Sequence, residues 1–507
     1  MTVSFKNVFT HLASSSSFRR SLSFLLPISF LVIVLTCVRF ANVFEYNIDE
    51  GLYTMRAYLY TKGYALYKDI WMDQPPLLVL VLSGLFKIFG PSMYLARLLT
   101  VLFSTLLLWA VYQIISKTQN TLSALWAVGA IILSSFYLQF SVAVVSTVPS
   151  IALAMLSIYG IVLYQESYKK RYLIFSGGVF GLALMIKFFA VIFLPGIIAE
   201  VLMFERKKRA SGENLFARSM SASMQWLVTF SVVVLYIAFV AAPISFYQII
   251  QPYMLARKAY IMKGGNMAPW FIGAYDIVPL VLCGLFFVKR DQKGFFLIPL
   301  ISFVFGVLIL ATHRPRWPNH QLYVMVPLCW LASFGVYALC RQVGEEWKNR
   351  NKPLRRRAAV VIFCLSSALA LSLVAIPLKY NRLSSQLLPP QWPDGWRIVT
   401  LMKQYSKQTH LVVTDSPIFA FYAQLPVPPF LASCSGKRVR TKLLTADDFI
   451  DIIQKEKPEL ILFARFPAIR RRATPYIKNL YDEMYQSPDH RMMFYVLKRL
   501  SDKVSKR

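Results

Sequence analysis

Residues 172–204 read YLIFSGGVFGLALMIKFFAVIFLPGIIAEVLMF, an almost wholly apolar stretch with Lys187 near its middle. One helix needs only about 20 apolar residues to cross the hydrocarbon core of a bilayer, so this stretch is too long for a single span. A lysine at the centre of a bilayer is also costly. We therefore predict two short membrane spans joined at a turn on the outer face, with Lys187 at that turn.

The composition of the whole chain is that of a multi-pass membrane protein. Of its 507 residues, 56% are hydrophobic and only 16% are charged, whereas soluble domains carry about 25% charged residues. This excludes a disordered chain, a coiled coil and an ordinary cytosolic enzyme. The 56 Lys and Arg residues outnumber the 24 Asp and Glu residues. Because the basic residues mostly separate apolar blocks, we expect membrane lipids and phosphate-bearing lipids as partners, and no nucleic acid.

The apolar blocks predict an α-helical polytopic domain with about 11 transmembrane helices over residues 21–378. The first, at 21–40, follows a basic cytoplasmic tail of residues 1–20 and resembles an uncleaved signal anchor. The stretch 172–204 supplies two. The other eight lie at roughly 95–115, 121–140, 145–165, 225–248, 270–288, 295–311, 321–341 and 358–378.

Basic residues in the short loops predict the orientation. Runs such as 169–171 and 206–209 place those loops and the N-terminus in the cytoplasm. The apolar segment 76–89 is too short to span, so we predict a re-entrant or interfacial juxtamembrane helix in a first outer loop, 41–92. The compartment expected is a prokaryotic plasma (inner) membrane, although an ER membrane gives the same signals.

Everything after residue 378 is then outside the cytoplasm. Strand candidates at 410–414 and 459–463 alternate with helix candidates at 418–423 and 446–455. This alternation favours a small C-terminal α/β domain over residues 379–507, with a boundary near 388–390. The domain has no catalytic signature of its own. It either binds an anionic glycan or the acceptor, or braces the membrane domain.

The first outer loop carries two adjacent carboxylates, Asp49 and Glu50, just beyond the first span. A carboxylate at the membrane interface is well placed to act as a general base on a lipid-borne substrate. The same residues also suit the start of a helix, where carboxylates cap the first turn. Further along the loop, Asp69 and Asp73 also have an alternative role as turn formers.

A set of short motifs follows in order along the chain: Asp49-Glu50, Tyr67-Lys68-Asp69, Asp73-Gln74-Pro75-Pro76-Leu77, the run from Phe89 to Arg97, the SGGVFGLA run at 176–183, and HRPRWPNH at 313–320. In this order they resemble the GT-C superfamily of membrane glycosyltransferases, and especially the protein O-mannosyltransferase and aminoarabinose transferase group. The resemblance is densest over residues 45–190.

The resemblance implies a polyprenyl-phosphate-dependent enzyme of cell-envelope glycosylation. It would transfer a hexosyl or pentosyl group to a lipid, glycan or protein acceptor outside the cytoplasm, with inversion. Asp49 would be the catalytic base that deprotonates the acceptor hydroxyl, and Glu50 would support it. Prepositioned cations would stabilise charge on the departing phosphate. The residues expected to bind the substrate or its phosphate are Lys187, Arg97, Arg314, Arg316 and His320, together with Asp69 and Asp73.

Several of these candidates have structural alternatives. Lys187 could snorkel at a turn between two spans. Arg314 and Arg316 could anchor lipid headgroups, and His320 could simply begin a helix. The aromatic residues near span ends suit an interfacial belt better than a sugar platform; they are Tyr53, Trp71, Trp270 and Trp317.

One position departs from the pattern of the group. Relatives often place a second carboxylate where this chain has Thr147. Either Asp49 works alone, or Asp69 or Asp73 substitutes, or the activity has been lost. We expect no metal and no other cofactor, since a divalent cation would require two hard oxygen ligands.

Two other functions stay open from the sequence. A lipid-linked sugar transporter or flippase would also be polytopic and basic, but transporters usually contain inverted repeats and polar residues at mid-membrane. Here no repeat is evident, and the polar residues cluster at one face. A non-catalytic membrane assembly subunit is the second alternative, because Thr147 cannot ionise.

Overall fold

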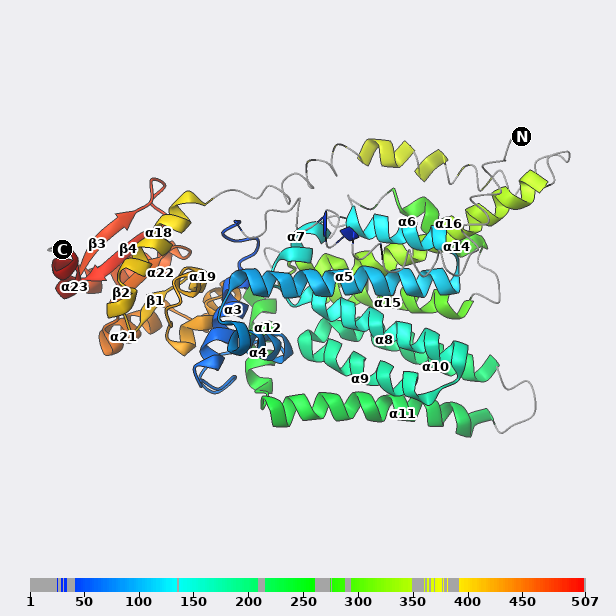
Figure 1. The fold of residues 1–507 in the computed structure, drawn as a ribbon, viewed down its shortest axis with the longest axis horizontal. Helices are drawn as coiled ribbons and strands as arrows, with labels where there is room; N and C mark the ends of the chain where they lie inside the picture. Colours follow the sequence, from blue (N-terminus) through cyan, green and yellow to red (C-terminus); the bar gives the residue numbers. More distant parts are fainter. Residues whose placement is uncertain are drawn as a thin grey trace.

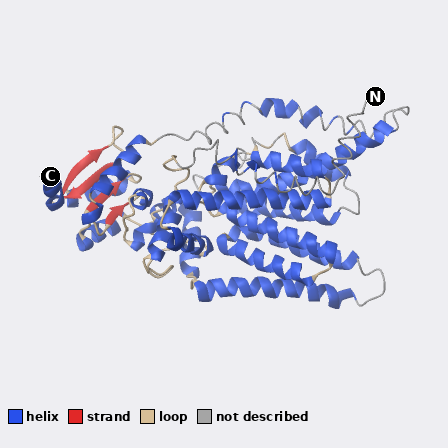
Figure 2. Ribbon diagram, viewed as in Figure 1, coloured by secondary structure: helices blue, strands red, loops and turns tan. Residues whose placement is uncertain are grey.

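The computed structural model describes residues 42–134, 136–207, 215–259, 276–287, 293–348 and 392–505, with residue 274 and a few residues of 25–33 and 360–381. A bundle of long helices fills one end of an elongated molecule, and a small sheet with its helices fills the other (Figures 1 and 2). The boundary at 388–390, most of the predicted span at 21–40 and part of the predicted span at 358–378 lie outside the described residues.

Within the described residues, five helices are long and apolar enough to cross a membrane: Met93–Thr118, Thr147–Ser167, Ala222–Ala241, Phe295–Thr312 and Pro318–Gln342. Shorter apolar helices accompany them, among them Thr121–Ile132 and Phe188–Phe204. The protein is therefore a multi-pass membrane protein. The total of eleven spans and the orientation in the membrane stay predictions.

The helices of the bundle follow one another closely along the chain. Two of them begin at polar caps, since the side chains of Ser92 and Asn120 accept hydrogen bonds from Leu95 N and Ser123 N. The elements are α5 (Met93–Thr118), α6 (Thr121–Ile132), α7 (Tyr137–Val142), α8 (Thr147–Ser167), α9 (Lys170–Ile186), η1 (Phe188–Phe193), α10 (Leu194–Lys207), α11 (Leu215–Leu235), η2 (Tyr236–Ala241), α14 (Val278–Phe287), α15 (Lys293–Thr312), η5 (Pro318–Gln321) and α16 (Leu322–Lys348).

The apolar stretch 172–204 breaks at the predicted residue. Helix α9 ends at Ile186, and Lys187 has an extended backbone, with φ −157° and ψ 125°, before the short helix η1 begins. The predicted interruption at Lys187 is thus confirmed. Small residues in the preceding helix allow close packing: a Cβ at Gly177 would lie 2.5 Å from the carbonyl oxygen of Trp226 in α11.

The outer loop folds into two helices, α3 (Asp49–Thr61) and α4 (Leu77–Phe89), which pack on each other. Helix α4 has 13 residues, too few for a full span, and buries one apolar face that includes Leu78, Leu82 and Phe86. Together with α12 (Phe246–Ala259), these helices lie between the bundle and the sheet (Figure 1).

The C-terminal unit, residues 392–505, contains a four-stranded sheet in the order β1-β2-β4-β3. Strands β1 (Val412–Thr414) and β2 (Leu460–Phe463) are parallel, with Val413 opposite Ile461, while β4 (Met493–Leu497) is antiparallel to β2 and to β3 (Tyr481–Gln486). Its helices are α18 (Pro393–Gln404), α19 (Pro417–Tyr422), α20 (Gly436–Arg440), α21 (Ala446–Glu456), α22 (Pro467–Ile477) and α23 (Lys498–Ser505). The predicted elements at 410–414, 418–423, 446–455 and 459–463 correspond to β1, α19, α21 and β2.

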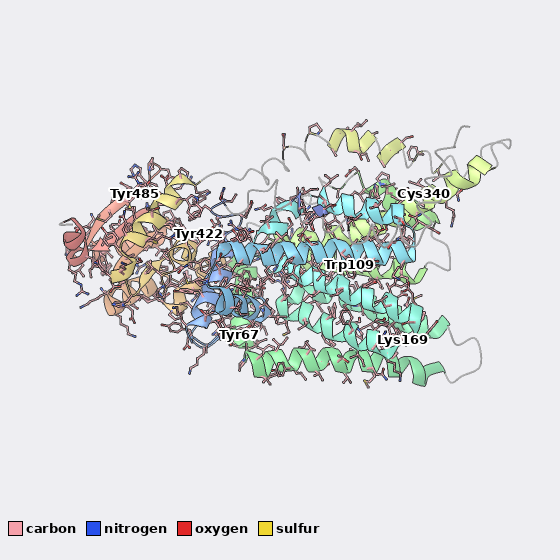
Figure 3. The ribbon with its side chains drawn as sticks, in the orientation of Figure 1. Tyr67, Trp109, Lys169, Cys340, Tyr422 and Tyr485 are labelled. Carbon is pink, nitrogen blue, oxygen red and sulfur yellow. The ribbon has the colours of Figure 1, made fainter. Side chains whose placement is uncertain are left out.

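The C-terminal unit and the outer loop share one hydrophobic core. The Phe44 ring lies 4.8 Å from the Phe419 ring and 5.2 Å from the Tyr422 ring, measured between centroids. The hydroxyl of Tyr422, which is labelled in Figure 3, donates to the Phe44 carbonyl. Because apolar packing is continuous here, the unit is held directly against α3.

Gly51 allows the closest approach in this core. A Cβ at this position would lie 2.7 Å from Ile418 Cβ and 2.8 Å from its backbone nitrogen. We expect Gly51→Ala to lower the free energy of unfolding by about 1–3 kcal/mol, because α3 or α19 must shift. Thermal unfolding in detergent would measure this.

Gly84→Ala in α4 is the matched control. This helical glycine has no atom within 4 Å of a built Cβ, so alanine there should leave stability unchanged or raise it slightly. Equal thermal unfolding midpoints for Gly51→Ala and Gly84→Ala would contradict the close packing of α3 on α19.

Candidate functional site

A cavity of about 400 Å³ lies where the outer loop, the end of the helix bundle and the C-terminal unit meet. All three regions contribute polar side chains to it. Its polar and aromatic lining includes Asn47, Asp49, Tyr53, Arg56, Asp73 and Gln74 from the outer loop, Ser146, Lys187, Tyr253, Asn319 and His320 from the bundle and α12, and Ser435, Lys437, Arg440, Arg465 and Phe466 from the C-terminal unit.

Four of the predicted site residues line this cavity: Asp49, Asp73, Lys187 and His320. Asp49 lies in the first turn of α3, half-buried, and its backbone nitrogen donates to Asn47 Oδ1 at 2.9 Å. Burial raises the pKa of the Asp49 carboxyl above its usual value, while the charges of Lys187 and Arg465 oppose the rise. A carboxylate with a raised pKa is a stronger base for a hydroxyl proton.

Glu50, the neighbouring carboxylate, points away from the cavity and is fully buried. Its Oε1 accepts from Arg97 Nε at 2.9 Å and Val144 N at 3.1 Å, and its Oε2 accepts from Arg97 Nη2 at 2.7 Å and Tyr46 N at 2.8 Å. Arg97 also donates to the carbonyl of Val43. The pair therefore ties the start of α3 to α5 and to two loops, and neither residue lines the cavity.

Asp73 lies between two cations. Its Oδ2 is 2.6 Å from Lys437 Nζ, and its Oδ1 is 3.6 Å from Arg56 Nη2. Burial acts to raise the pKa of Asp73, but these two charges hold it below the usual value. Asp73 is thus an ionised carboxylate inside the cavity and joins the outer loop to α20.

Lys187 is almost fully buried at the break between α9 and η1. Its Nζ donates to Thr147 Oγ1 at 2.7 Å, and the rings of Phe189 and Tyr323 lie 5.8 and 5.9 Å away. Thr147, the predicted departure from the family pattern, therefore offers Lys187 a neutral hydroxyl. The hydroxyl orients the ammonium group without neutralising its charge.

His320 enters the cavity from η5, beside Asn319. Its ring lies 4.5 Å from the tilted Phe189 ring and 5.2 Å from the His313 ring in an edge-on arrangement, measured between centroids. The predicted cations of the same turn are elsewhere: Arg314 and Arg316 donate to backbone carbonyls at residues 311 and 313 and do not line the cavity.

Asp69 is also outside the cavity lining. Its Oδ2 accepts from Ala65 N at 2.8 Å, which closes a turn of the outer loop. This contact matches the alternative of a turn former.

The sequence did not single out the cations of the C-terminal unit. Lys437 and Arg440 come from α20, and Arg465 follows β2. Asp415, directly after β1, accepts from the backbone nitrogens of Ala464, Arg465 and Phe466 at 2.6–3.0 Å, which holds that loop against the cavity. Ligands commonly bind at the carboxyl ends of parallel strands. In the sequence, the basic run at 435–440 was the feature that could have identified these cations.

The cavity is electropositive. In the described part of the chain, five basic side chains line it, from Arg56, Lys187, Lys437, Arg440 and Arg465, against the carboxylates of Asp49 and Asp73. Such a lining suits an anionic group such as a phosphate, because fixed cations compensate its charge without reorganisation.

Comparison with known proteins supports the fold. Residues 73–237 match the sequence family described as dolichyl-phosphate-mannose-protein mannosyltransferase. The structure is similar to ArnT from Cupriavidus metallidurans bound to undecaprenyl phosphate (TM-score 0.56, 12% identity, covering 95% of this chain and 98% of that one). It is also similar to the oligosaccharyltransferase AglB from Archaeoglobus fulgidus in complex with an inhibitory peptide and a dolichol-phosphate (TM-score 0.52, 13% identity, 93% and 74%).

The sequence has no match among curated proteins. The two structural similarities, at low identity but over nearly the whole chain, show that this protein shares its fold with these two proteins. The resemblance seen in the sequence motifs is therefore confirmed.

The Glu50–Arg97 pair makes a direct prediction. Glu50→Gln should lower the free energy of unfolding by about 3–5 kcal/mol, because it leaves the buried Arg97 guanidinium without a counter-charge. Glu166→Gln removes an exposed partner of Lys117, a pair at 2.8 Å, and should cost less than about 1 kcal/mol. Similar thermal midpoints for both variants would contradict a bracing role for Glu50.

Proposed function

We propose that this protein is a membrane-embedded glycosyltransferase. It moves a sugar from a polyprenyl-phosphate-linked donor to a lipid, glycan or protein acceptor on the extracytoplasmic face. The observation that carries the proposal is one electropositive cavity that contains both the Asp49 carboxylate and the buried Lys187 ammonium group. The undecaprenyl phosphate and dolichol-phosphate bound by the two similar proteins support a lipid-phosphate ligand.

Asp49 acts on the acceptor side of the reaction. Its ionised carboxylate takes the proton of the acceptor hydroxyl while the hydroxyl oxygen attacks the anomeric carbon. The bond from that carbon to the phosphate oxygen breaks at the same time, and the phosphate leaves with the electron pair. A single displacement of this kind inverts the anomeric configuration of the transferred hexosyl or pentosyl group.

Lys187 acts on the leaving-group side. Negative charge grows on the phosphate oxygens as the sugar leaves, and a prepositioned cation stabilises that charge. Thr147 holds the ammonium group by one hydrogen bond of 2.7 Å. In this proposal Asp49 works as the single base, and Thr147 orients Lys187 where a second carboxylate would neutralise it.

Glu50 and Arg97 support the reaction from outside the cavity. Glu50 follows Asp49 directly in α3, and its four hydrogen bonds hold the first turn of the helix. Glu50 is thus a positioning residue, and Arg97 is its partner.

The non-catalytic assembly subunit is the second candidate, and Thr147 is the observation that favours it. A lipid-linked sugar transporter would also use a basic cavity. Only the enzyme depends on proton transfer to Asp49, so one substitution distinguishes it from the other two.

Asp49→Asn should abolish transfer while the protein remains abundant and stable. Purified protein in detergent would be incubated with a panel of radiolabelled polyprenyl-phosphate sugars and a crude envelope extract. Loss of a general base lowers turnover by about 10²–10⁴-fold. Asp447→Asn, at an exposed ion pair with Arg472 on the C-terminal unit, is the control and should keep full activity. Equal turnover by wild type and Asp49→Asn would refute the proposed base.

The pH profile gives an independent check. Only ionised Asp49 accepts a proton, so activity should be present above its pKa and be lost as the pH falls through it. Because burial raises that pKa, the acidic limb should lie above the usual value of 3.8. Lys187→Met removes a charge that opposes the rise, so its residual activity at saturating donor should show a limb at higher pH. If the acidic limb of the pH profile stays at the same pH in Lys187→Met, the limb reports the titration of a group other than Asp49.

A further inference from the structure

The proposed function leaves the cations of the C-terminal unit without a role. Among those that line the cavity, Lys437 is the most deeply buried, with only 5% of its surface exposed. Its Nζ lies 2.6 Å from Asp73 Oδ2 and 3.6 Å from the centroid of the Tyr253 ring. A lysine is rarely buried to this extent without a specific counter-charge.

Lys437 and Lys187 enter the same cavity from opposite parts of the molecule, α20 and the end of α9. Both lysines also act on His313. Burial is the largest cause that lowers the pKa of His313 to about 3, and the positive charges of Lys437 and Lys187 lower it further. Like charges that share a partly buried cavity repel each other. An anion between them would remove that repulsion.

Asp73 provides only part of this compensation. Its single carboxylate is shared between Lys437 and Arg56, at 2.6 and 3.6 Å. A phosphate group carries more oxygen acceptors and, once its sugar has left, up to two negative charges. It therefore matches this pair of cations better than one carboxylate does.

The surrounding contacts fix Lys437 in place. The Ser435 hydroxyl caps α20 by accepting from Arg438 N, and the Arg438 guanidinium lies 4.4 Å from the Trp71 ring centroid. Ser433 accepts from Arg56 Nε at 2.7 Å and donates to the Trp71 carbonyl. These contacts join Arg56 and Trp71 of the outer loop to the segment that carries Lys437.

We propose that Lys437 and Arg56 form a second half of the phosphate site, opposite Lys187, and that Asp73 competes with the phosphate for these two cations. The C-terminal unit then supplies a direct ligand to the phosphate of the lipid carrier. This inference rests on the proposed function for the identity of that ligand. It assigns to Asp73 the role of a built-in competitor and adds no step to the reaction.

Binding of farnesyl phosphate to the full-length protein in detergent tests the inference, with farnesol as the uncharged reference. Lys437→Met should weaken phosphate-dependent binding about tenfold, the value of one charge-assisted hydrogen bond. Lys437→Arg should keep most of the binding, and it replaces the methionine variant if that variant fails to fold. Asp73→Asn should tighten binding severalfold, because the competing charge is gone.

Lys455→Met is the control. This lysine of α21 has a side chain that is 83% exposed, and its ion pair with the neighbouring Glu456 is long, at 4.0 Å. Its binding should equal that of the wild type. Unchanged affinity for farnesyl phosphate in both Lys437→Met and Asp73→Asn would overturn the inference. Weaker binding in both variants would also overturn it, because that is the result expected if Lys437 and Asp73 form a purely structural ion pair. An increase in KM for the acceptor alone would assign the subsite to an anionic acceptor and overturn it as well.

The two proposals fail in different ways. Farnesyl phosphate binding requires no turnover, so opposite effects of Lys437→Met and Asp73→Asn support the subsite even if no sugar is transferred. Conversely, transfer that depends on Asp49 while Lys437→Met leaves farnesyl phosphate binding intact overturns the subsite and leaves the glycosyltransferase standing.

Discussion

The site depends first on the buried ion pair between Glu50 and Arg97. Both side chains are almost inaccessible, and each carboxylate oxygen accepts two hydrogen bonds. A buried pair stabilises a fold only when its remaining hydrogen-bonding capacity is satisfied in this way. Here the pair fixes the first turn of α3 against the bundle. Successive helical residues point about 100° apart, so anchoring Glu50 inward turns Asp49 toward the cavity.

The second constraint is the continuous core between the outer loop and the C-terminal unit. Phe44 packs against α19, and Gly51 allows α3 to approach Ile418. Because this junction is apolar and tightly packed, the loops after β1 and β2 are held at one wall of the cavity. A loosely tethered domain would not keep Lys437 within 2.6 Å of Asp73.

Charge distribution then gives the cavity its chemical character. The hydroxyl of Thr147 in place of a carboxylate gives Lys187 a neutral hydrogen-bond partner, while Asp73 partly neutralises the opposite wall. The departure at Thr147, for which a single base, a substitute carboxylate and lost activity all stayed open from the sequence, adds no further negative charge beside Lys187. An electropositive cavity of this kind favours a phosphate ligand.

Much of this protein follows from its sequence alone. Hydropathy reports directly on the cost of placing a side chain in lipid, so the membrane class and the break at Lys187 could be predicted from local pattern. The strands β1 and β2 could also be predicted from short segments. Of the predicted cations, however, only Lys187 reaches the cavity, whereas Arg97 pairs with Glu50 and Arg314 and Arg316 bond their own turn. Lys437 and Arg465 become part of the site only when the C-terminal unit docks on α3. Local pattern determines which segments form and what they bury, but which charges meet depends on packing between segments far apart in the chain, and only the tertiary structure decides that.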